Sequence, residues 1–434
     1  MLQSESDDPL GRYTLHGPLY TGDDSGMSIS NCWAIDMTIL ELGTRRYAIW
    51  SGWPDDRDLQ YLYIAPLKDP LTVAAPRTRI CANDDFLWER VDERPQGRGL
   101  NEAPEVLQHA GRTFVSYSCS GSWQPSYKLG LLELKPGGDP LNPEDWRKCP
   151  KPVFQSSART FGVGHNSFVK SPDGTEDWLV YHAKCDRRDG WRRVVFAQRF
   201  EWNTGGFPDF GEPVASGQPL PLPSGERVQR VSGPRSFNFA TSEDLAGWSY
   251  FGHHQMMDLR DGWLHLGRPP ARPINTFRSG EKIVLDGGRW TNFTASVRMR
   301  PFEPNGQSGM LFRVQAPAVG YHAQIGYFAG LVPGGARVTL EVTDGTIGRE
   351  IASAEVPQPP PAECELAVSA RGNEIKVSLQ GMTLIQTNDA TFAFGSIGLR
   401  VVDTHAAFSQ LTIEPLADGA VPAQSRAPSL SQRP

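Results

Sequence analysis

A long internal repeat constrains the fold of this 434-residue chain more than any other feature. Three segments share one layout, an apolar strand, a polar turn and a second strand ending in an aromatic residue: "ILELGTRRYAIWSG", "EVLQHAGRTFVSYSCSG" and "SFVKSPDGTEDWLVYHA". When Trp50, Tyr117 and Tyr181 are aligned, the repeats lie 67 and 64 residues apart. A further outer strand follows each of them, in "YLYIAPLKDP", "YKLGLLELKPGGDP" and "VVFAQRFEWNTGGFPDFG". β-Hairpins repeated at this long period predict the blades of a β-propeller.

The composition agrees with an all-β chain and excludes several classes of partner. The 44 Gly and 36 Pro supply many turns, and the 12 Trp, 11 Tyr and 20 Phe favour strands. The net charge of −6 is the wrong sign for a nucleic-acid binder. Because no run of about 18 apolar residues exists, we expect no membrane span.

The repeat count predicts an incomplete propeller. Residues 1–217 hold about three blades, whereas closed propellers have four to eight. The stretch "SDDPLG" near the N-terminus resembles the outer-strand ending "LKDPLT", so the chain is expected to open at the tail of a blade. The sequence therefore predicts a propeller domain over 1–217 whose first blade or blades lie upstream of Met1.

Three ionisable residues recur at the start of the first strand in successive repeats. Asp36 lies 14 residues before its aromatic marker, Glu102 lies 15 before and His165 lies 16 before. A buried charge costs several kcal/mol unless it is paired, hydrogen-bonded or used. The innermost strands of a propeller converge on its axis, so we interpret the three as one site. The alternative is three satisfied polar residues of the core.

The motifs "WAID", "NEAPEVL", "YKLGLL", "GVGHNSF", "GTEDWLVYHA" and "FPDFGEPV" occur in this order between about residues 7 and 214. Together they resemble glycoside hydrolase family 43. The resemblance implies a five-bladed propeller enzyme that removes α-L-arabinofuranosyl or β-D-xylosyl units from plant polysaccharides with inversion. The motifs "YAIWSGWP" and "YSCSGSWQPSYKLGLL" look more like the arabinofuranosidase branch.

The resemblance also assigns roles to the three residues in register. Glu102 of "NEAP" would be the general acid, and Asp36 of "WAID" would raise its pKa and orient it. His165 of "GHN" matches a histidine that faces a metal ion, often calcium, or its water shell on the propeller axis. One mild departure from these motifs is Val163, where the family has proline. No cofactor is required by this mechanism, and a structural Ca²⁺ on the axis is expected.

The general base is not assigned to any residue of this chain. In the family it is an aspartate on the first blade, which the repeat count places upstream. Four acidic residues near the N-terminus do not stand in the sequence context that the family has around its general base: Asp7, Asp8, Asp23 and Asp24.

Glu105 of "NEAPE" competes with Glu102 for the role of the acid. Strand alternation places the two side chains, three residues apart, on opposite faces, and the repeat register favours Glu102.

The candidates for sugar contact are His182, Arg193, Trp53 and Trp123, with Arg199 and Trp191 as further possibilities. Hydrogen bonding at the propeller rim and packing between blades are the alternatives for these residues. His109 is interpreted as a turn residue.

The second half reads as a separate β-sandwich. Residues 218–236 are rich in Pro and Gly and predict a linker. Over 237–416 apolar residues alternate with period two, which indicates half-buried antiparallel strands: Phe293, Ala295, Val297 and Met299; Met310, Phe312 and Val314; Val338, Leu340 and Val342; Leu366 and Val368; Ile375, Val377 and Leu379; Leu411 and Ile413. Residues 417–434 are expected to form a disordered tail.

The stretch "FGSIGLRVVDTHAAFSQLTI" resembles the closing strands of concanavalin-like and laminin-G-like jelly rolls. By analogy, this domain is expected to bind a polysaccharide, with packing against the propeller as the alternative role. The aromatic residues to test are Trp248, Trp263, Tyr321 and Tyr327.

Two functional hypotheses follow. The first is an inverting exo-glycosidase acting on arabinose- or xylose-containing polysaccharides or oligosaccharides. The second is an inactive or weakly active carbohydrate-binding remnant that lacks the blade with the general base. No secretory signal is visible at the N-terminus; the resemblance implies secretion of a full-length parent. The six cysteines lack metal-ligand spacing, and one or two disulfides remain open.

Overall fold

The computed structural model describes residues 1–8, 11–27, 31–55, 57–227, 230–252, 257–267, 280–319, 323–332, 334, 336–345, 348–358 and 361–416. The chain divides into two compact units, Met1–Glu226 and Arg227–Pro434, with the boundary inside the predicted linker. Regular structure in the described residues is almost entirely β-strand, so the all-β prediction is confirmed. Among these residues, no helix is long and apolar enough for a membrane span, and the six cysteines are free thiols.

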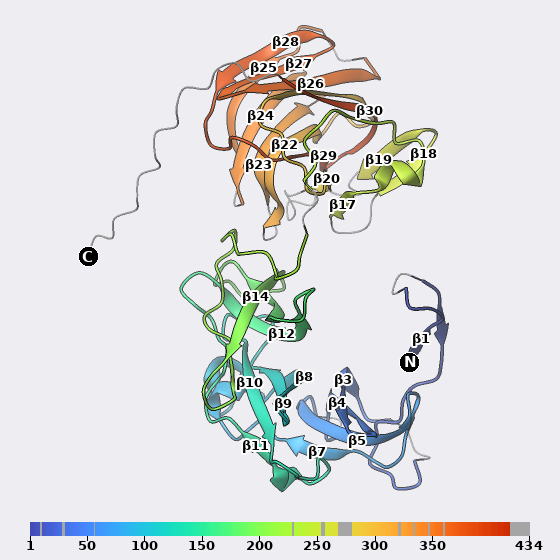
Figure 1. Cartoon of the computed structure of the whole chain (residues 1–434), viewed down its shortest axis with the longest axis vertical. Helices are drawn as coiled ribbons and strands as arrows, with labels where there is room; N and C mark the ends of the chain where they lie inside the picture. Colours follow the sequence, from blue (N-terminus) through green and yellow to red (C-terminus); the bar gives the residue numbers. More distant parts are fainter. Residues whose placement is uncertain are drawn as a thin grey trace, which may run out of the picture. The chain divides into compact units, whose positions relative to one another are not determined.

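Three antiparallel sheets, here called blades 1, 2 and 3, follow one another along the first unit (Figure 1). Blade 1 contains β3 (Ala34–Leu42), β4 (Arg45–Gly52), β5 (Tyr61–Asp69) and β6 (Thr72–Val73), and β7 (Thr78–Cys81) also pairs with β5. Blade 2 contains β8 (Asn101–His109), β9 (Arg112–Cys119), β10 (Lys128–Leu134) and β11 (Trp146–Lys148). Blade 3 contains β12 (Phe161–Lys170), β13 (Asp177–Lys184), β14 (Val194–Trp202) and β15 (Pro208–Asp209).

Short elements complete the first unit. Strands β1 (Leu2–Ser4) and β2 (Tyr13–Leu15) form a two-stranded sheet. The 3-10 helices η1 (Leu87–Glu89) and η2 (Val91–Glu93) lie between blades 1 and 2, and η3 (Pro143–Asp145) precedes β11.

The first strand of each blade is its innermost strand. Strand β3 contacts β8, and β8 in turn contacts β12, while the later strands of each blade lie outward in sequence order. The repeat therefore brings the starts of these three strands together, as expected for propeller blades. The total of five blades inferred from the resemblance stays a prediction.

Apolar side chains fill the space between neighbouring blades. Leu40 and Ile49 of blade 1 share one core cluster with Val115 and Tyr117 of blade 2. A second cluster joins blade 2 to blade 3 and contains Tyr181. The aromatic residues that marked the repeat are all buried: Tyr117 and Tyr181 pack between blades, and Trp50 packs against blade 1 itself.

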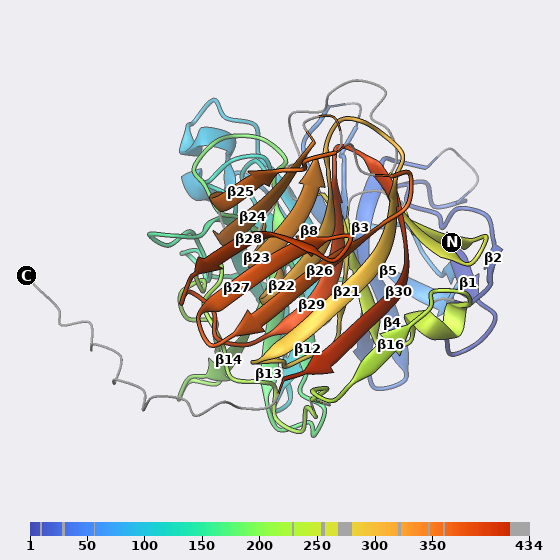
Figure 2. The ribbon, with the colours of Figure 1, turned by 90° about the horizontal axis from the view of Figure 1, so that it is seen from above.

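The second unit is a sandwich of two antiparallel sheets, which face each other in Figure 1 and overlap in Figure 2. One sheet has the order β18 (Met257–Arg260), β19 (Trp263–Gly267), β30 (His405–Pro415), β21 (Phe293–Pro301), β26 (Cys364–Arg371), β27 (Glu374–Leu379) and β28 (Met382–Asn388), and β16 (Arg235–Phe237) pairs with β30. The other has the order β17 (Trp248–Phe251), β20 (Glu281–Leu285), β29 (Ser396–Val402), β22 (Gln307–Val319), β23 (Ala323–Val332), β24 (Arg337–Asp344) and β25 (Arg349–Glu355). The 3-10 helix η4 (Ser242–Leu245) precedes β17.

The alternating apolar residues predicted for this domain lie in the core between its sheets, with one exception. Val314 belongs to a cluster on the other face of its sheet, together with Leu311 and Phe328. The reason is a register shift in β22, where Arg313 has a positive φ of 48°. A bulge of this kind inserts a residue and reverses the alternation after it.

Two of the four aromatic residues proposed for sugar binding in the sandwich are core residues. Tyr327 is fully buried between the sheets, and Trp263 is buried beneath the guanidinium of Arg300. Neither ring is open to a sugar. Trp248 is half-buried against Phe237, and Tyr321 and the predicted tail 417–434 lie outside the described residues.

Candidate active site

The innermost strand of each blade carries a β-bulge at the corresponding place. Register shifts occur between Ile35 and Thr38 in β3, between Glu102 and Glu105 in β8, and between Gly164 and Ser167 in β12. The residues at the bulges, Asp36, Ala103 and His165, have positive φ angles of 58°, 49° and 48°. This left-handed conformation costs a residue other than Gly about 1–2 kcal/mol. Bulges beside active sites re-aim side chains, so a carboxylate in an apolar strand here has a structural reason.

The bulges refine the register deduced from the repeat. Asp36 and His165 occupy equivalent positions, whereas the equivalent of both in β8 is Ala103. Glu102 therefore lies one residue before that position. The three side chains still belong to one constellation, because the contacts below connect them.

Asp36 joins blade 1 to blades 2 and 3. Its Oδ2 accepts a hydrogen bond of 3.1 Å from the backbone N–H of Ala103. Its Oδ1 lies 3.9 Å from Nε2 of His165. The carboxylate thus holds the bulge of the neighbouring blade and places a negative charge beside Glu102.

Glu102 lies in a partly buried position at the start of β8. Its Oε1 accepts a hydrogen bond of 2.6 Å from Oη of Tyr127, a fully buried side chain. Burial raises the pKa of the Glu102 carboxyl, and the charge of Asp36 also acts upward. The Tyr127 hydrogen bond and the positive charges of His165 and Arg193 act downward without cancelling the rise. A carboxyl that keeps its proton toward neutral pH can serve as a general acid.

His182 and Arg193 form a pair beside Tyr127. Arg193 donates from a terminal nitrogen to Nε2 of His182 at 2.9 Å, because a guanidinium has only donors. The imidazole is therefore neutral, with its proton on Nδ1. Burial, reinforced by the charges of Arg193 and His165, lowers the pKa of His182 to about 3. His182 consequently offers fixed hydrogen-bonding geometry, and it carries no charge at neutral pH.

His165 projects from the bulge of β12 with an exposed side chain. Its backbone N–H donates to Oγ of Ser118 at 2.7 Å, which ties blade 3 to blade 2. Ca²⁺ takes six to eight oxygen ligands, whereas the described part of the chain has no group of three or more His, Cys, Asp or Glu side chains arranged to hold an ion. These residues do not fit direct coordination of calcium, so the ion implied by the resemblance stays a prediction.

The predicted sugar-stacking tryptophans fall into two pairs. Trp123 lies near Trp191, with ring centroids 6.0 Å apart and planes inclined by 51°. Trp191 is 61% exposed, and the guanidinium of Arg193 lies over its ring. Trp53 stacks on Trp33 at 4.5 Å and 16°. The first pair adjoins the His182–Arg193 pair, whereas Trp53 and Trp33 flank β3 and β4 of blade 1.

Glu105, the other candidate for the general acid, has different hydrogen-bond partners from Glu102. Glu105 is partly buried with a raised pKa caused by burial, and it was distinguished from Glu102 by strand alternation. That argument is wrong, because the bulge between the two residues interrupts the alternation: they pair with Ser118 and Ser116, which lie two apart on β9. Their neighbours nevertheless differ, since Glu105 hydrogen-bonds Thr38 and Glu102 bonds Tyr127.

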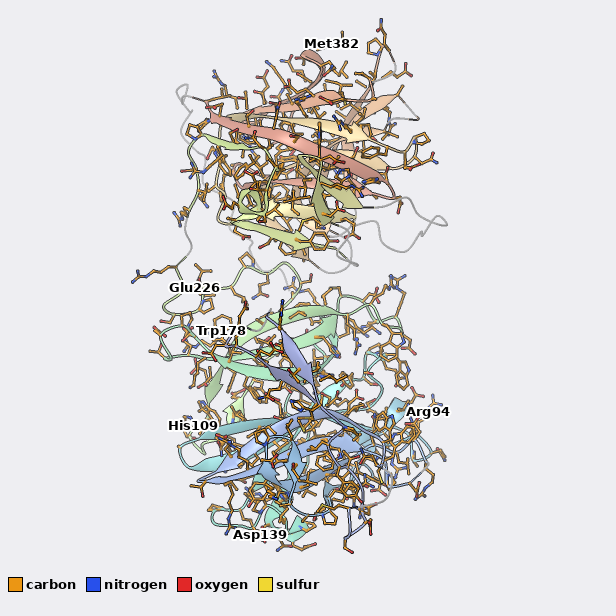
Figure 3. All side chains as sticks on the ribbon, turned by 90° about the vertical axis from the view of Figure 1, so that its right-hand side faces the viewer. Arg94, His109, Asp139, Trp178, Glu226 and Met382 are labelled. Carbon is orange, nitrogen blue, oxygen red and sulfur yellow. The ribbon has the colours of Figure 1, made fainter. Side chains whose placement is uncertain are left out.

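Arg199 and His109 contact residues outside the group formed by Asp36, Glu102 and His165. Arg199 pairs with Glu176 and Glu201 on the surface of blade 3. The ring of His109 stacks on Trp202 with centroids 3.9 Å apart, at the outer edge of the first unit (Figure 3).

Among the acidic residues near the N-terminus, Asp23 forms a two-point ion pair with the buried Arg77, at 2.8 and 2.9 Å. The bond with Arg77 lowers the pKa of the Asp23 carboxyl. Asp23 is therefore held in an ion pair with Arg77, and the absence of a base in this chain stays a prediction.

Sequence reasoning missed Tyr127 as the hydrogen-bond partner of Glu102 and Trp33 as the stacking partner of Trp53. Tyr127 stands in "YKLGLL", which was quoted for the resemblance, and Trp33 stands in "WAID". Proximity to these motifs was the available signal, but the contacts depend on packing between blades.

Comparison with known proteins gives a consistent result for the first unit. The sequence model described as "Glycosyl hydrolases family 43" matches residues 1–208. The α-L-arabinofuranosidase 43 of Humicola insolens is 36% identical over 199 residues, which cover 44% of this chain and 40% of that protein. The extracellular exo-α-(1→5)-L-arabinofuranosidase of Streptomyces avermitilis is 34% identical over 227 residues, which cover 50% of this chain and 44% of that protein. The chain thus spans less than half the length of these two curated relatives.

Among solved structures, the α-L-arabinofuranosidase from Lactobacillus brevis aligns with a TM-score of 0.44 at 30% identity. The alignment covers 49% of this chain and 65% of that chain.

Proposed function

Because residues 1–208 belong to glycosyl hydrolase family 43, we propose that the first unit carries the proton-donating half of a glycoside hydrolase active site. The reaction is hydrolysis of a terminal α-L-arabinofuranosyl bond, or of a β-D-xylosyl bond, in plant polysaccharides or oligosaccharides. The names of the curated relatives favour the arabinofuranoside.

One observation carries the proposal: the Glu102 carboxyl is held by Tyr127 at 2.6 Å in a partly buried site beside Asp36, and burial raises its pKa. In inverting hydrolysis a protonated carboxyl donates to the leaving glycosidic oxygen as the bond to the anomeric carbon breaks. Water attacks the opposite face of the sugar and gives its proton to a second carboxylate roughly 6.5–9.5 Å from the first. We assign the first role to Glu102 and the second to no residue of this chain.

Asp36 supports the acid in two ways. Its charge disfavours ionisation of Glu102. Its hydrogen bond to Ala103 fixes the backbone next to the acid. The site also provides Arg193, which is hydrogen-bonded to His182, as a donor for sugar hydroxyls, with Trp123 and Trp191 as walls on which a sugar ring can stack.

The test is an assay of the full chain on arabino-oligosaccharides and on p-nitrophenyl α-L-arabinofuranoside and β-D-xyloside, with NMR detection of the first-formed anomer. Because no general base is assigned, we expect slow turnover with inversion, and a further loss of about 10²-fold or more in the Glu102→Gln variant on the oligosaccharide. Glu105→Gln is the matched control, since it lies three residues away on the same strand and also has a raised pKa. Binding of the oligosaccharide without turnover would favour the carbohydrate-binding remnant instead.

For the second unit, polysaccharide binding remains a proposal supported by the sandwich fold and by the half-buried Trp248. Affinity electrophoresis of the full chain and of Trp248→Ala in gels with arabinan or arabinoxylan tests it. Equal retardation in gels with and without polysaccharide would rule this role out.

A further inference from the structure

Tyr127 connects two blades through the two ends of its side chain. Its ring lies against β12 so closely that a Cβ added to Gly164 would come within 2.2 Å of it. On the blade 3 side it is also parallel to His182, with ring centroids 5.5 Å apart and planes inclined by 4°. Its hydroxyl reaches Glu102 on blade 2. The ring is therefore held by blade 3, and the hydroxyl position is defined by that packing.

The hydrogen bond between Tyr127 and Glu102 has a definite direction. Burial raises the pKa of the Tyr127 phenol well above its usual value, so the hydroxyl keeps its proton and donates it to Oε1. A protonated carboxyl has one O–H and one oxygen that only accepts. With Oε1 engaged as the acceptor, the carboxyl proton resides on Oε2.

We propose that Tyr127 is a positioning residue that holds Oε1 of Glu102 and leaves Oε2 to deliver the proton to the leaving group. This inference rests on the proposed role of Glu102 as the general acid. In the step, the proton moves from Oε2 to the glycosidic oxygen while the electron pair of the breaking bond stays on that oxygen. The carboxylate that forms on Glu102 keeps the Tyr127 hydrogen bond, which stabilises its new charge.

The chain offers a matched control for a merely structural role. Tyr117 is also fully buried, and its hydroxyl donates to Oε1 of another buried glutamate, Glu89, at 3.1 Å. Removal of either hydroxyl leaves the ring in the core and takes one hydrogen-bond donor from a glutamate, although Glu89 keeps Asn101 and Lys148 as further donors. Only Tyr127→Phe alters the environment of Glu102.

The experiment compares the full chain with Tyr127→Phe and Tyr117→Phe on arabinofuranosides of poor (alkyl) and good (dinitrophenyl) leaving groups. A good leaving group departs without protonation. We expect Tyr127→Phe to lower kcat about tenfold or more on the alkyl glycoside and by less than about threefold on the dinitrophenyl glycoside. Tyr117→Phe should change both rates by the same factor. Equal losses on both substrates with Tyr127→Phe, or no loss, would overturn the proposal.

A second variant and a second readout keep the inference separate from the proposed function. Gly164→Ala displaces the Tyr127 ring and keeps its hydroxyl, and we expect the same dependence on the leaving group.

Carbon-13 NMR of labelled glutamate follows the Glu102 carboxyl without any turnover. The Glu102 signal is identified by its loss in the Glu102→Gln variant. Because a donor favours the charged form, Tyr127→Phe should raise the pKa of Glu102 by about one unit, and Tyr117→Phe should not. An unchanged titration would refute the positioning role, whereas an inactive wild-type chain or a fully active Glu102→Gln variant would refute the proposed function alone.

Discussion

Oδ2 of Asp36 accepts a hydrogen bond from the backbone N–H of Ala103, the residue that follows Glu102. Both Asp36 and Ala103 have left-handed backbones at the bulges of adjacent innermost strands. The carboxylate of one blade therefore fixes the bulge of the next and lies close enough to act on the Glu102 carboxyl. Four expected outcomes follow from this arrangement.

Replacement of Asp36 by Asn should move the basic limb of the pH profile of kcat/KM to lower pH. The negative charge of Asp36 acts to raise the pKa of Glu102, so its removal lowers that pKa, and the acid loses its proton earlier as the pH rises. Asn keeps an oxygen for the Ala103 N–H. We also expect kcat to fall about 10- to 100-fold. Asp139→Asn is the control, because Oδ1 of Asp139 likewise accepts from a backbone N–H, that of Leu141, at the rim of the unit (Figure 3); an identical pH profile for Asp36→Asn and wild type would contradict the role.

Replacement of Glu102 by Gln should stabilise the fold more at neutral than at acidic pH. The folded-state pKa of Glu102 is raised above its unfolded value by burial. The stability that the Glu102 carboxyl contributes to the fold is therefore fully present below about pH 4, the pKa of a glutamate in the unfolded chain. This stability is lost as the pH rises through the pKa of Glu102 in the folded protein. Gln does not titrate and avoids this loss. Thermal unfolding of both proteins at pH 4 and pH 7 measures the effect, and a difference in Tm that does not grow with pH would argue against a raised pKa.

Arg193→Met should shift the same basic limb in the opposite direction to Asp36→Asn. The positive charge of Arg193 lowers the pKa of Glu102, so its loss lets that pKa rise further. Met preserves much of the packing on Trp191. Arg199→Met, which removes a surface charge paired with Glu176 and Glu201, should leave the profile in place. If Arg199→Met has the larger effect, the assignment of Arg193 to the site is wrong.

Trp191→Ala should weaken the use of longer substrates without a large change in stability. The indole is 61% exposed, so its removal leaves little apolar surface uncovered. Loss of one stacked ring corresponds to about 0.5–1.5 kcal/mol, and we expect KM for an arabino-oligosaccharide to rise about 2- to 10-fold. Trp191→Phe keeps a flat ring and should restore most of the affinity. A KM that is unchanged in Trp191→Ala would exclude stacking at this position.

The period of the repeat and the alternation within strands were sufficient to predict the architecture. Burial of Trp50, Tyr117 and Tyr181 between or against blades is a packing requirement that each repeat meets with local sequence, so it is visible along the chain. The same holds for the alternating core positions of the sandwich from Phe293 to Ile413. The constellation of Asp36, Glu102 and His165 could be predicted for the same reason, because each stands 14 to 16 residues before its aromatic marker.

The bulges and the contacts across blades were decided only by the tertiary structure. Alternation assumes an unbroken period of two, so it failed at Val314 and between Glu102 and Glu105, where one inserted residue resets the register. The hydrogen bond from Tyr127 to Glu102 depends on how closely β12 approaches that ring. The sequence of a strand specifies which side chains are apolar and therefore buried. The direction of a polar side chain at a bulge depends instead on backbone geometry imposed by neighbouring blades. That is why the sequence alone could predict Glu102 as the candidate acid, whereas its hydrogen bond with Tyr127 became visible only in three dimensions.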